Sequence, residues 1–294
     1  MKVLITGASG FIGRALSQRL TESGHEAIPL VRGEPGTGVR TWDVRAGRID
    51  DDALVGIDAV VHLAGESIGG RWTPAKKQAI LSSRIEGTDL ISKAVASAKP
   101  SVFVCGSAIG FYGSRGEDVL TEDSPAGSGF LADVTVAWEE AAKPASEAGV
   151  RTVLARTALV LEDEGGSFPR MLLPFKFGIG GPLGSGRQWW AWITLEDEIR
   201  AIMHCLETDA LEGPVNLAAP NPVRNGDFGK ALGRALKRPA LLPAPGFGLK
   251  LLLGGEFADE VLLASQRVVP TRLEQSGFEF SHPHLPAALD AVLA

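Results

Sequence analysis

The sequence predicts an α/β protein with a Rossmann-like, doubly wound parallel sheet and a smaller C-terminal substrate-side lobe. Short apolar runs alternate with helical patterns through the first half, and a glycine-rich turn follows the first run. Strands alternating with helices form βαβ units with right-handed crossovers. After about residue 165 the chain becomes rich in Gly, Pro and aromatic residues. We therefore expect domains over residues 1–165 and 166–294, with a soft boundary that some segments cross to rejoin the main sheet.

Apolar runs and helical spacings locate the elements along the chain. Strands are expected at residues 2–6, 26–32, 59–65, 101–107 and 151–161. Helices are expected at residues 11–24, 76–98, 134–149, 195–208, 225–237 and 284–294. The run AVVHLAG is typical of a strand that a parallel sheet buries on both faces.

Composition narrows the class of protein. The 294 residues carry a net charge of −6 with scattered basic residues, which argues against a nucleic-acid groove and an anionic membrane surface. We expect a cytoplasmic protein, because no signal-peptide pattern or 18-residue apolar segment is visible. Cys105 and Cys205 lie in apolar runs and are expected to be buried free thiols. His62 is interpreted as a core histidine, and no metal site is expected. The acidic runs 139–140 and 196–198 look like solvated helix faces.

The stretch GASGFIG has the spacing of a phosphate-binding turn. Gly7 allows the sharp turn, Gly10 lets a pyrophosphate approach the backbone, and Gly13 lets the helix pack against the strand. The helix N-terminus then offers free N–H groups to the phosphates. The turn residues expected to contact the cofactor are Gly7, Ser9, Gly10, Phe11, Ile12 and Gly13.

The end of the second strand indicates which dinucleotide binds. An NAD-binding unit places Asp or Glu there, to accept hydrogen bonds from the ribose hydroxyls. Here the strand ends with Val31 and Arg32, and an arginine can pair with a 2′-phosphate. The sequence therefore favours NADP(H), although Arg32 could instead be an ordinary surface charge.

Six ordered stretches carry a resemblance to a known family: TGASGFIG, HLAGESI, RWTPAKKQAILSSRIEGT, GSAIGFYG, PLGSGRQWWAWI and GPVNLAAPNPVRNGDFGKALGRALKRPA. With them, and with GGEFADEVLLASQRVVPTRLEQSGFEF after the last, the chain resembles an atypical extended short-chain dehydrogenase/reductase of the NAD-dependent epimerase/dehydratase superfamily. More narrowly, it resembles the "epimerase family protein" subgroup. The resemblance implies NADP(H) on the glycine turn, with Arg32 at the 2′-phosphate. The further cofactor contacts that it implies are Leu63, Ala64, Gly65, Glu66, Arg84 and Arg156.

Two of these arginines keep alternative interpretations. Arg84 lies on a long helix, where an arginine most often faces solvent. Arg156 interrupts an apolar strand, and a buried arginine needs a partner. An anionic ligand or an internal carboxylate would serve Arg156 equally well.

The proton-transfer pair usual in this superfamily, Tyr-x-x-x-Lys, does not occur in the chain. Tyr112 is the one tyrosine, and Gly116 stands four residues after it. The resemblance places Leu131 at the usual tyrosine position and Thr135 at the lysine position. Ser107 matches the superfamily serine that holds a substrate oxygen.

Tyr112 therefore has two interpretations, a substitute proton donor or a residue for packing or substrate contact.

The stretch QWWAW offers a second candidate site. Gln188, Trp189, Trp190 and Trp192 could line a substrate cleft, or could form a strand that clamps the lobe to the core. Alternation would place Trp190 and Trp192 on one face of that strand and Trp189 on the other.

Two hypotheses follow. The first is an NADP(H)-dependent oxidoreductase or epimerase-like enzyme acting on a carbonyl or hydroxyl of an unknown, nucleotide- or sugar-like small molecule, with Ser107 and Tyr112 as its catalytic candidates. The second is a protein that senses NADP(H) without turnover, because the usual proton-transfer pair is missing.

Overall fold

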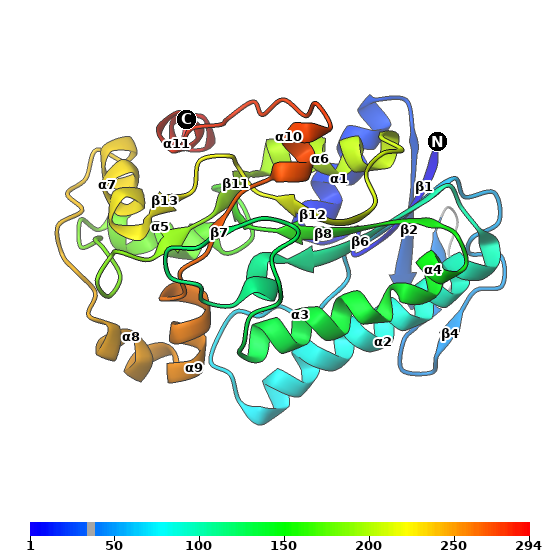
Figure 1. The fold of residues 1–294 in the computed structure, drawn as a ribbon, viewed down its shortest axis with the longest axis horizontal. Coiled ribbons are helices and arrows are strands. Elements are labelled where there is room, and N and C mark those ends of the chain that lie inside the picture. The colour runs from blue at the N-terminus through cyan, green and yellow to red at the C-terminus, as the bar shows by residue number, and fades with distance from the viewer. Residues whose placement is uncertain (34–38) are drawn as a thin grey trace.

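The computed structural model describes residues 1–33 and 39–294, and its centre is an eight-stranded sheet (Figure 1). Across the sheet the strands follow the order β12 (Gly213–Leu217), β8 (Arg151–Thr157), β6 (Val102–Ala108), β5 (Ala59–His62), β1 (Lys2–Thr6), β2 (Glu26–Arg32), β3 (Arg40–Asp43) and β4 (Arg48–Ile49). The neighbours are parallel apart from β3 and β4, which confirms the expected sheet. From β1 the chain first winds toward β2 and β3 and then returns to β5 on the other side. Ligands of open α/β sheets bind at such a switch point.

Helices cover both faces of the sheet because successive residues of its strands point to opposite sides. The helices on one face are α1 (Phe11–Glu22) and α6 (Leu195–Glu207), and those on the other are α2 (Pro74–Ala98), α3 (Phe130–Ala141) and α4 (Lys143–Glu147). Val3 and Ile5 of β1 pack with α1 and α6, whereas Leu4 packs with α2 and α3. These two apolar layers form the main core.

A second core lies beside the carboxyl ends of the strands. It gathers apolar side chains such as Phe168, Trp192, Phe228 and Leu289. The elements of this lobe and its connections are η1 (Ile109–Tyr112), β7 (Val119–Leu120), β9 (Leu159–Leu161), α5 (Phe168–Lys176), β10 (Trp189–Trp190), β11 (Trp192–Thr194), β13 (Val223–Arg224), α7 (Asn225–Ala235), α8 (Gly246–Leu253), α9 (Gly255–Phe257), η2 (Ala258–Leu262), β14 (Arg267–Val268), α10 (Thr271–Gln275) and α11 (Leu285–Val292).

β12 and α6 come from the second half of the chain and join the main sheet and its helical layer, which the soft boundary at residue 165 allowed for. The structure differs from the expected element map in several other places. The expected strand over residues 151–161 is the pair β8 and β9. The expected strand of tryptophans is two short strands, because β10 pairs with β13 and β11 with β9. The expected helix over residues 134–149 is the pair α3 and α4, with Pro144 in the first turn of α4.

The structure also bears on the expectations for the cysteines, His62, membrane-spanning helices and metal sites. Cys105 and Cys205 are buried and free, as expected. His62 is also a core residue, since Thr6 and Thr88 hydrogen-bond its two ring nitrogens and burial lowers its pKa to about 3. Within residues 1–33 and 39–294 no helix is long and apolar enough to cross a bilayer. Over those same residues, no group of three or more His, Cys, Asp and Glu side chains could hold a metal ion.

The interpretation of residues 196–198 as a solvated face is wrong for two of the three. Asp197 and Glu198 have no exposed surface, because the first turn of α6 packs against the rest of the molecule. The Asp197 carboxylate accepts hydrogen bonds from the backbone amides of Ser281 and His282. It therefore fixes the segment that leads into α11.

Candidate functional site

The glycine turn joins β1 to α1 at the switch point. Gly7 has a φ of +70°, and a Cβ there would meet the backbone of Leu63 and Ala64 at 2.9 Å. A Cβ on Gly13 would lie 2.2 Å from the Gly7 carbonyl oxygen, so the turn requires glycine at both positions. Helix α1 starts after Gly10 with no side-chain cap and no acidic residue in its first turn. Its first amides are therefore open to an anion.

The segment after β5 lies against this turn. Thr6 Oγ1 accepts hydrogen bonds from the amides of Leu63 and Ala64 at 3.1 and 3.2 Å, which holds the segment in place. Gly65 lies beside the guanidinium of Arg84, since a Cβ on Gly65 would be 3.5 Å from Arg84 Cζ. The structure thus brings the turn, the Leu63–Glu66 segment and Arg84 together, which is the grouping that the resemblance implied.

Arg84 is a half-buried cation with no carboxylate in direct contact among the described residues. Its guanidinium donates to the carbonyls of Glu66 and Ile80 at 2.9 and 3.2 Å and lies over the ring of Trp138. Burial lowers its pKa to about 10, which reflects the cost of the charged form there. An anionic ligand beside Gly65 would compensate that charge.

Arg32 and Lys76 lie with Arg84 on the side of the glycine turn, and these three cations form what we call the positive edge. Arg32 is exposed at the end of β2. Glu66 pairs with Lys76 at 2.6 Å, and this hydrogen bond, with the charges of Lys76, Arg84 and Arg32, lowers the pKa of Glu66. Three cations thus surround one carboxylate. Lys76 was not among the predicted cofactor contacts, although it is the first residue of the helix expected over residues 76–98.

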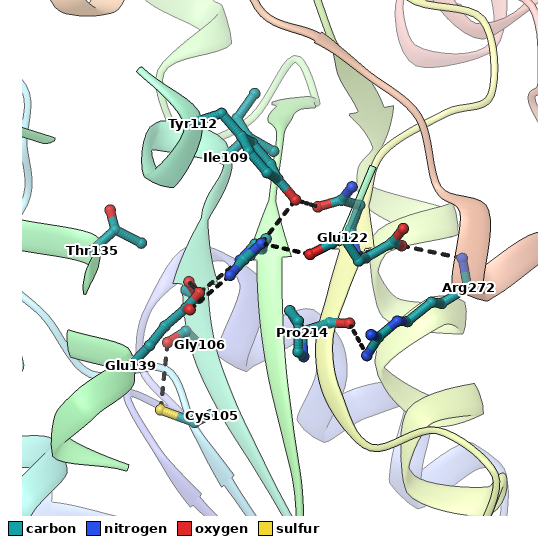
Figure 2. A network of polar contacts seen from close by, with 12 residues as sticks. Cys105, Gly106, Ile109, Tyr112, Glu122, Thr135, Glu139, Pro214 and Arg272 are labelled. Carbon is teal, nitrogen blue, oxygen red and sulfur yellow. Dashed lines mark hydrogen bonds and ion pairs between the residues drawn. The ribbon is translucent and has the colours of Figure 1, made fainter. Parts of the chain in front are cut away.

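A buried polar network lies beneath the carboxyl ends of β6 and β8 (Figure 2). Arg156 forms a two-point ion pair with Glu139, with both N–O distances at 2.8 Å. Its third nitrogen donates to the Tyr112 hydroxyl at 2.9 Å, and that hydroxyl donates to Asn216 at 2.7 Å. Ser107 Oγ donates to Glu139 at 2.6 Å.

This network decides between the alternatives for Arg156. Its partner is an internal carboxylate, and only 3% of the residue is exposed, so the predicted cofactor contact is not supported. The view of Glu139 as solvated is wrong for the same reason, whereas Glu140 is exposed as expected. A sequence signal existed, because an arginine inside an apolar strand requires a counter-charge.

The same network leaves the two catalytic candidates without a free hydroxyl. Tyr112 has no exposed surface, and its pKa is raised chiefly by burial. Ser107 is 4% exposed and bound to Glu139. The geometry therefore favours the packing interpretation of Tyr112 and gives no support for a substrate contact by Ser107.

A cavity of about 740 Å³ lies between α3 and the C-terminal lobe. Phe11 of the glycine turn lines it, so the cavity adjoins the proposed cofactor site. Leu131 and Thr135 line it one helical turn apart, and the Thr135 hydroxyl donates to the Leu131 carbonyl at 2.6 Å. The two positions that the resemblance assigns to the Tyr and Lys thus face this cavity with an apolar side chain and an internally bonded hydroxyl.

The aromatic stretch contributes only in part to the cavity. Trp189 and Trp190 line it. Trp192 is fully buried with its indole donating to the Asn221 carbonyl, and Gln188 donates to the carbonyls of Leu183 and Leu262. Gln188 and Trp192 are not among the described residues that line the cavity. The predicted substrate contact is therefore not supported for these two residues. Trp190 and Trp192 share one apolar cluster, but the stretch is two strands and both Trp189 and Trp190 line the cavity, so the expected alternation along one strand is not observed.

Comparison with known proteins agrees with this geometry. Residues 3–218 match the model of the NAD dependent epimerase/dehydratase family, and residues 244–292 match a domain of unknown function, DUF1731. An epimerase family protein of Mycobacterium tuberculosis is 44% identical, with 98% of this chain and 96% of that protein covered.

Solved structures show the same fold. The crystal structure of the human epimerase family protein SDR39U1 with NADPH is 35% identical, with a TM-score of 0.90 over 100% of this chain and 99% of that chain. The UDP-glucose 4-epimerase of Thermus thermophilus in complex with NAD has a TM-score of 0.77 at 18% identity, over 100% of this chain and 98% of the other. The second likeness shows the fold alone.

Proposed function

Because the chain belongs to the NAD-dependent epimerase/dehydratase family, we propose that it binds NADP(H) and acts as an oxidoreductase or epimerase-like enzyme on a carbonyl or hydroxyl compound. The single observation that carries the proposal is the glycine turn, which leaves no space for a Cβ at Gly7 or Gly13 and presents free helix amides. The positive edge beside it supports the phosphorylated cofactor. NADPH bound to the human relative supports the same choice.

Different residues would bind different parts of the cofactor. The first amides of α1 would bind the pyrophosphate, and Arg32 would bind the 2′-phosphate. Arg84 would compensate a phosphate charge beside Gly65. When bound, the reduced cofactor supplies a hydride to a carbonyl carbon, and the carbonyl oxygen takes a proton to become a hydroxyl.

We propose water as the source of that proton. The hydroxyls of Ser107 and Tyr112 are bonded within the buried network, and Thr135 donates to the Leu131 carbonyl. A water molecule that enters the cavity can take the place of the missing tyrosine, at the cost of a slower proton transfer.

The test is a titration of cofactor-free protein with NADPH and NADH, for the wild type and for Arg32→Ala. A lost charge-assisted contact should weaken NADPH binding about 10- to 100-fold. NADH binding should stay unchanged, because NADH has no 2′-phosphate. Arg48→Ala, on exposed β4, is the matched control. Absence of binding for both cofactors, or an equal loss for both, would refute the proposal.

A second candidate is an NADP(H)-sensing protein without turnover. The observation that favours it is the buried network around Arg156 and Glu139. In this network the hydroxyls of both catalytic candidates, Ser107 and Tyr112, are bonded to protein groups. It predicts tight NADPH binding with no NADPH consumption and no epimerised product across carbonyl and sugar-nucleotide panels. Detection of steady turnover would exclude it.

A further inference from the structure

The cavity wall differs in chemistry from what a nucleotide sugar needs. The wall that the C-terminal lobe contributes is formed by large apolar side chains. Among these are Met171, Phe175, Trp190, Leu249, Leu253 and Phe257. Cavities of this size commonly hold small-molecule ligands, and apolar walls bind through area removed from water.

The charges in the wall are mixed, and the one carboxylate of its described residues disfavours a diphosphate in that part of the cavity. Arg84 and Arg170 are its cationic members among the described residues, and Arg84 lies on the cofactor side. Glu260 also lines the cavity, and its carboxylate accepts the amides of Phe130 and Leu131 at 2.8 and 2.7 Å. A carboxylate fixed in this way stays beside the cavity and repels phosphate groups.

The polar amides of the wall are bonded to the protein. Gln266 donates to the carbonyl of Ile109 at 2.9 Å, and Asn225 accepts the amide of Leu183 at 2.7 Å. Their hydrogen-bonding atoms are thus partly used already. A sugar with several hydroxyls would leave polar groups unpaired in this wall.

Helix α8 forms an outer part of the wall and is apolar over most of its circumference, with Lys250 as its one charged residue. Leu249 and Leu253, one turn apart, line the cavity. Phe247, Leu251 and Leu252 of the same helix are 76–80% exposed. The helix therefore offers apolar surface on both the inner and the outer side of the cavity.

We propose that this cavity takes an apolar carbonyl compound, an aliphatic or aromatic ketone or aldehyde, rather than a nucleotide sugar. The inference rests on the proposed function and names its substrate class. The C-terminal segment of residues 244–292 supplies this specificity, because it contains both α8 and Glu260. The oxygen of the ligand would lie toward Leu131 and Thr135, and its apolar part would contact α8.

The test measures binding to the NADP⁺-saturated protein, which cannot reduce a ketone, by calorimetry with 2-decanone and with UDP-glucose. We expect 2-decanone to bind at least about tenfold more tightly than UDP-glucose. Leu253→Gln should weaken 2-decanone binding about tenfold, because it places a polar amide in the apolar wall. Leu252→Gln, on the exposed side of the same helix, is the matched control and should change nothing.

Each result is decisive. Tighter binding of UDP-glucose, or equal effects of the two substitutions, would overturn the proposal. Leu249→Gln is the second variant if Leu253→Gln fails to fold, and both should leave NADP⁺ affinity unchanged. If the wild type binds no NADP⁺, the proposed cofactor role fails. The same two ligands titrated without cofactor then still decide which class the cavity accepts.

Discussion

The cofactor-side edge and the buried network both depend on an arginine, and they compensate its charge in opposite ways. Arg84 donates to backbone carbonyls and has no carboxylate in direct contact within the described chain. Arg156 has a two-point partner in Glu139 and a third contact in Tyr112. A charge paired directly with a carboxylate is structural, whereas a charge without a direct ion pair beside a glycine turn can bind a ligand. This contrast separates the two sites more sharply than their residue types do.

The largest expected effect is the loss of stability when the network is broken. Glu139→Gln should lower the free energy of unfolding by about 3–5 kcal/mol, because it leaves the Arg156 charge buried without its counter-charge. Urea unfolding measures this change. Glu140→Gln is the matched control on the adjacent, exposed position and should cost less than about 1 kcal/mol. Equal losses for the two variants would show that the ion pair between Arg156 and Glu139 does not stabilise the fold.

Arg84→Met should show the reverse pattern. NADPH affinity should fall about 10- to 100-fold, because a charged contact is lost. Stability should change by no more than about 1 kcal/mol, since the methionine keeps the packing against Trp138 and no internal ion pair is broken. Fluorescence titration and urea unfolding check the two parts. A variant that unfolds readily but binds NADPH normally would reverse the assignment, and Lys93→Met on the same helix is the control.

Tyr112→Phe tests the contribution of the Tyr112 hydroxyl to the network. Removing the hydroxyl leaves the buried Asn216 oxygen without that donor, so the free energy of unfolding should fall by about 1–3 kcal/mol. NADPH affinity should not change. If turnover with a carbonyl substrate is found, its rate should also be kept. A complete loss of rate with intact folding would instead identify Tyr112 as the proton donor.

The last expected effect is a dependence of stability on pH, which comes from Glu198. Burial raises the pKa of this carboxyl to about 8, and Thr157 donates to one of its oxygens. Its pKa in the unfolded chain is lower, so the folded state holds the proton longer. Its stabilising contribution is therefore complete below the unfolded pKa and is lost as pH rises toward 8.

Glu198→Gln should remove that loss. Relative to the wild type, the variant should gain stability between pH 5 and pH 8, at no more than about 1.4 kcal/mol per pH unit. Glu196→Gln, exposed on the same helical turn, should show no such slope. Unfolding curves at several pH values measure both, and parallel profiles for the two variants would contradict the burial argument.

The sequence by itself determined the features that depend on neighbouring residues. The glycine turn is encoded in one strand, one turn and the start of one helix, and the structure places it as expected. The apolar runs likewise located β1, β2, β5, β6 and β8, because a strand buried on both faces has to be apolar throughout. The absence of a Tyr-x-x-x-Lys pair is also a property of the sequence alone.

The tertiary structure decided which polar groups meet. Arg156 finds Glu139 because β8 and α3 pack together, and no local pattern selects that glutamate over Glu140. Glu198 is buried and Glu196 exposed because one side of α6 packs against the sheet. β12 joins the sheet through its pairing with β8, although its residues lie in the second half of the chain. The chemistry of the cavity depends on segments far apart in the sequence, so only their packing shows that its wall is apolar.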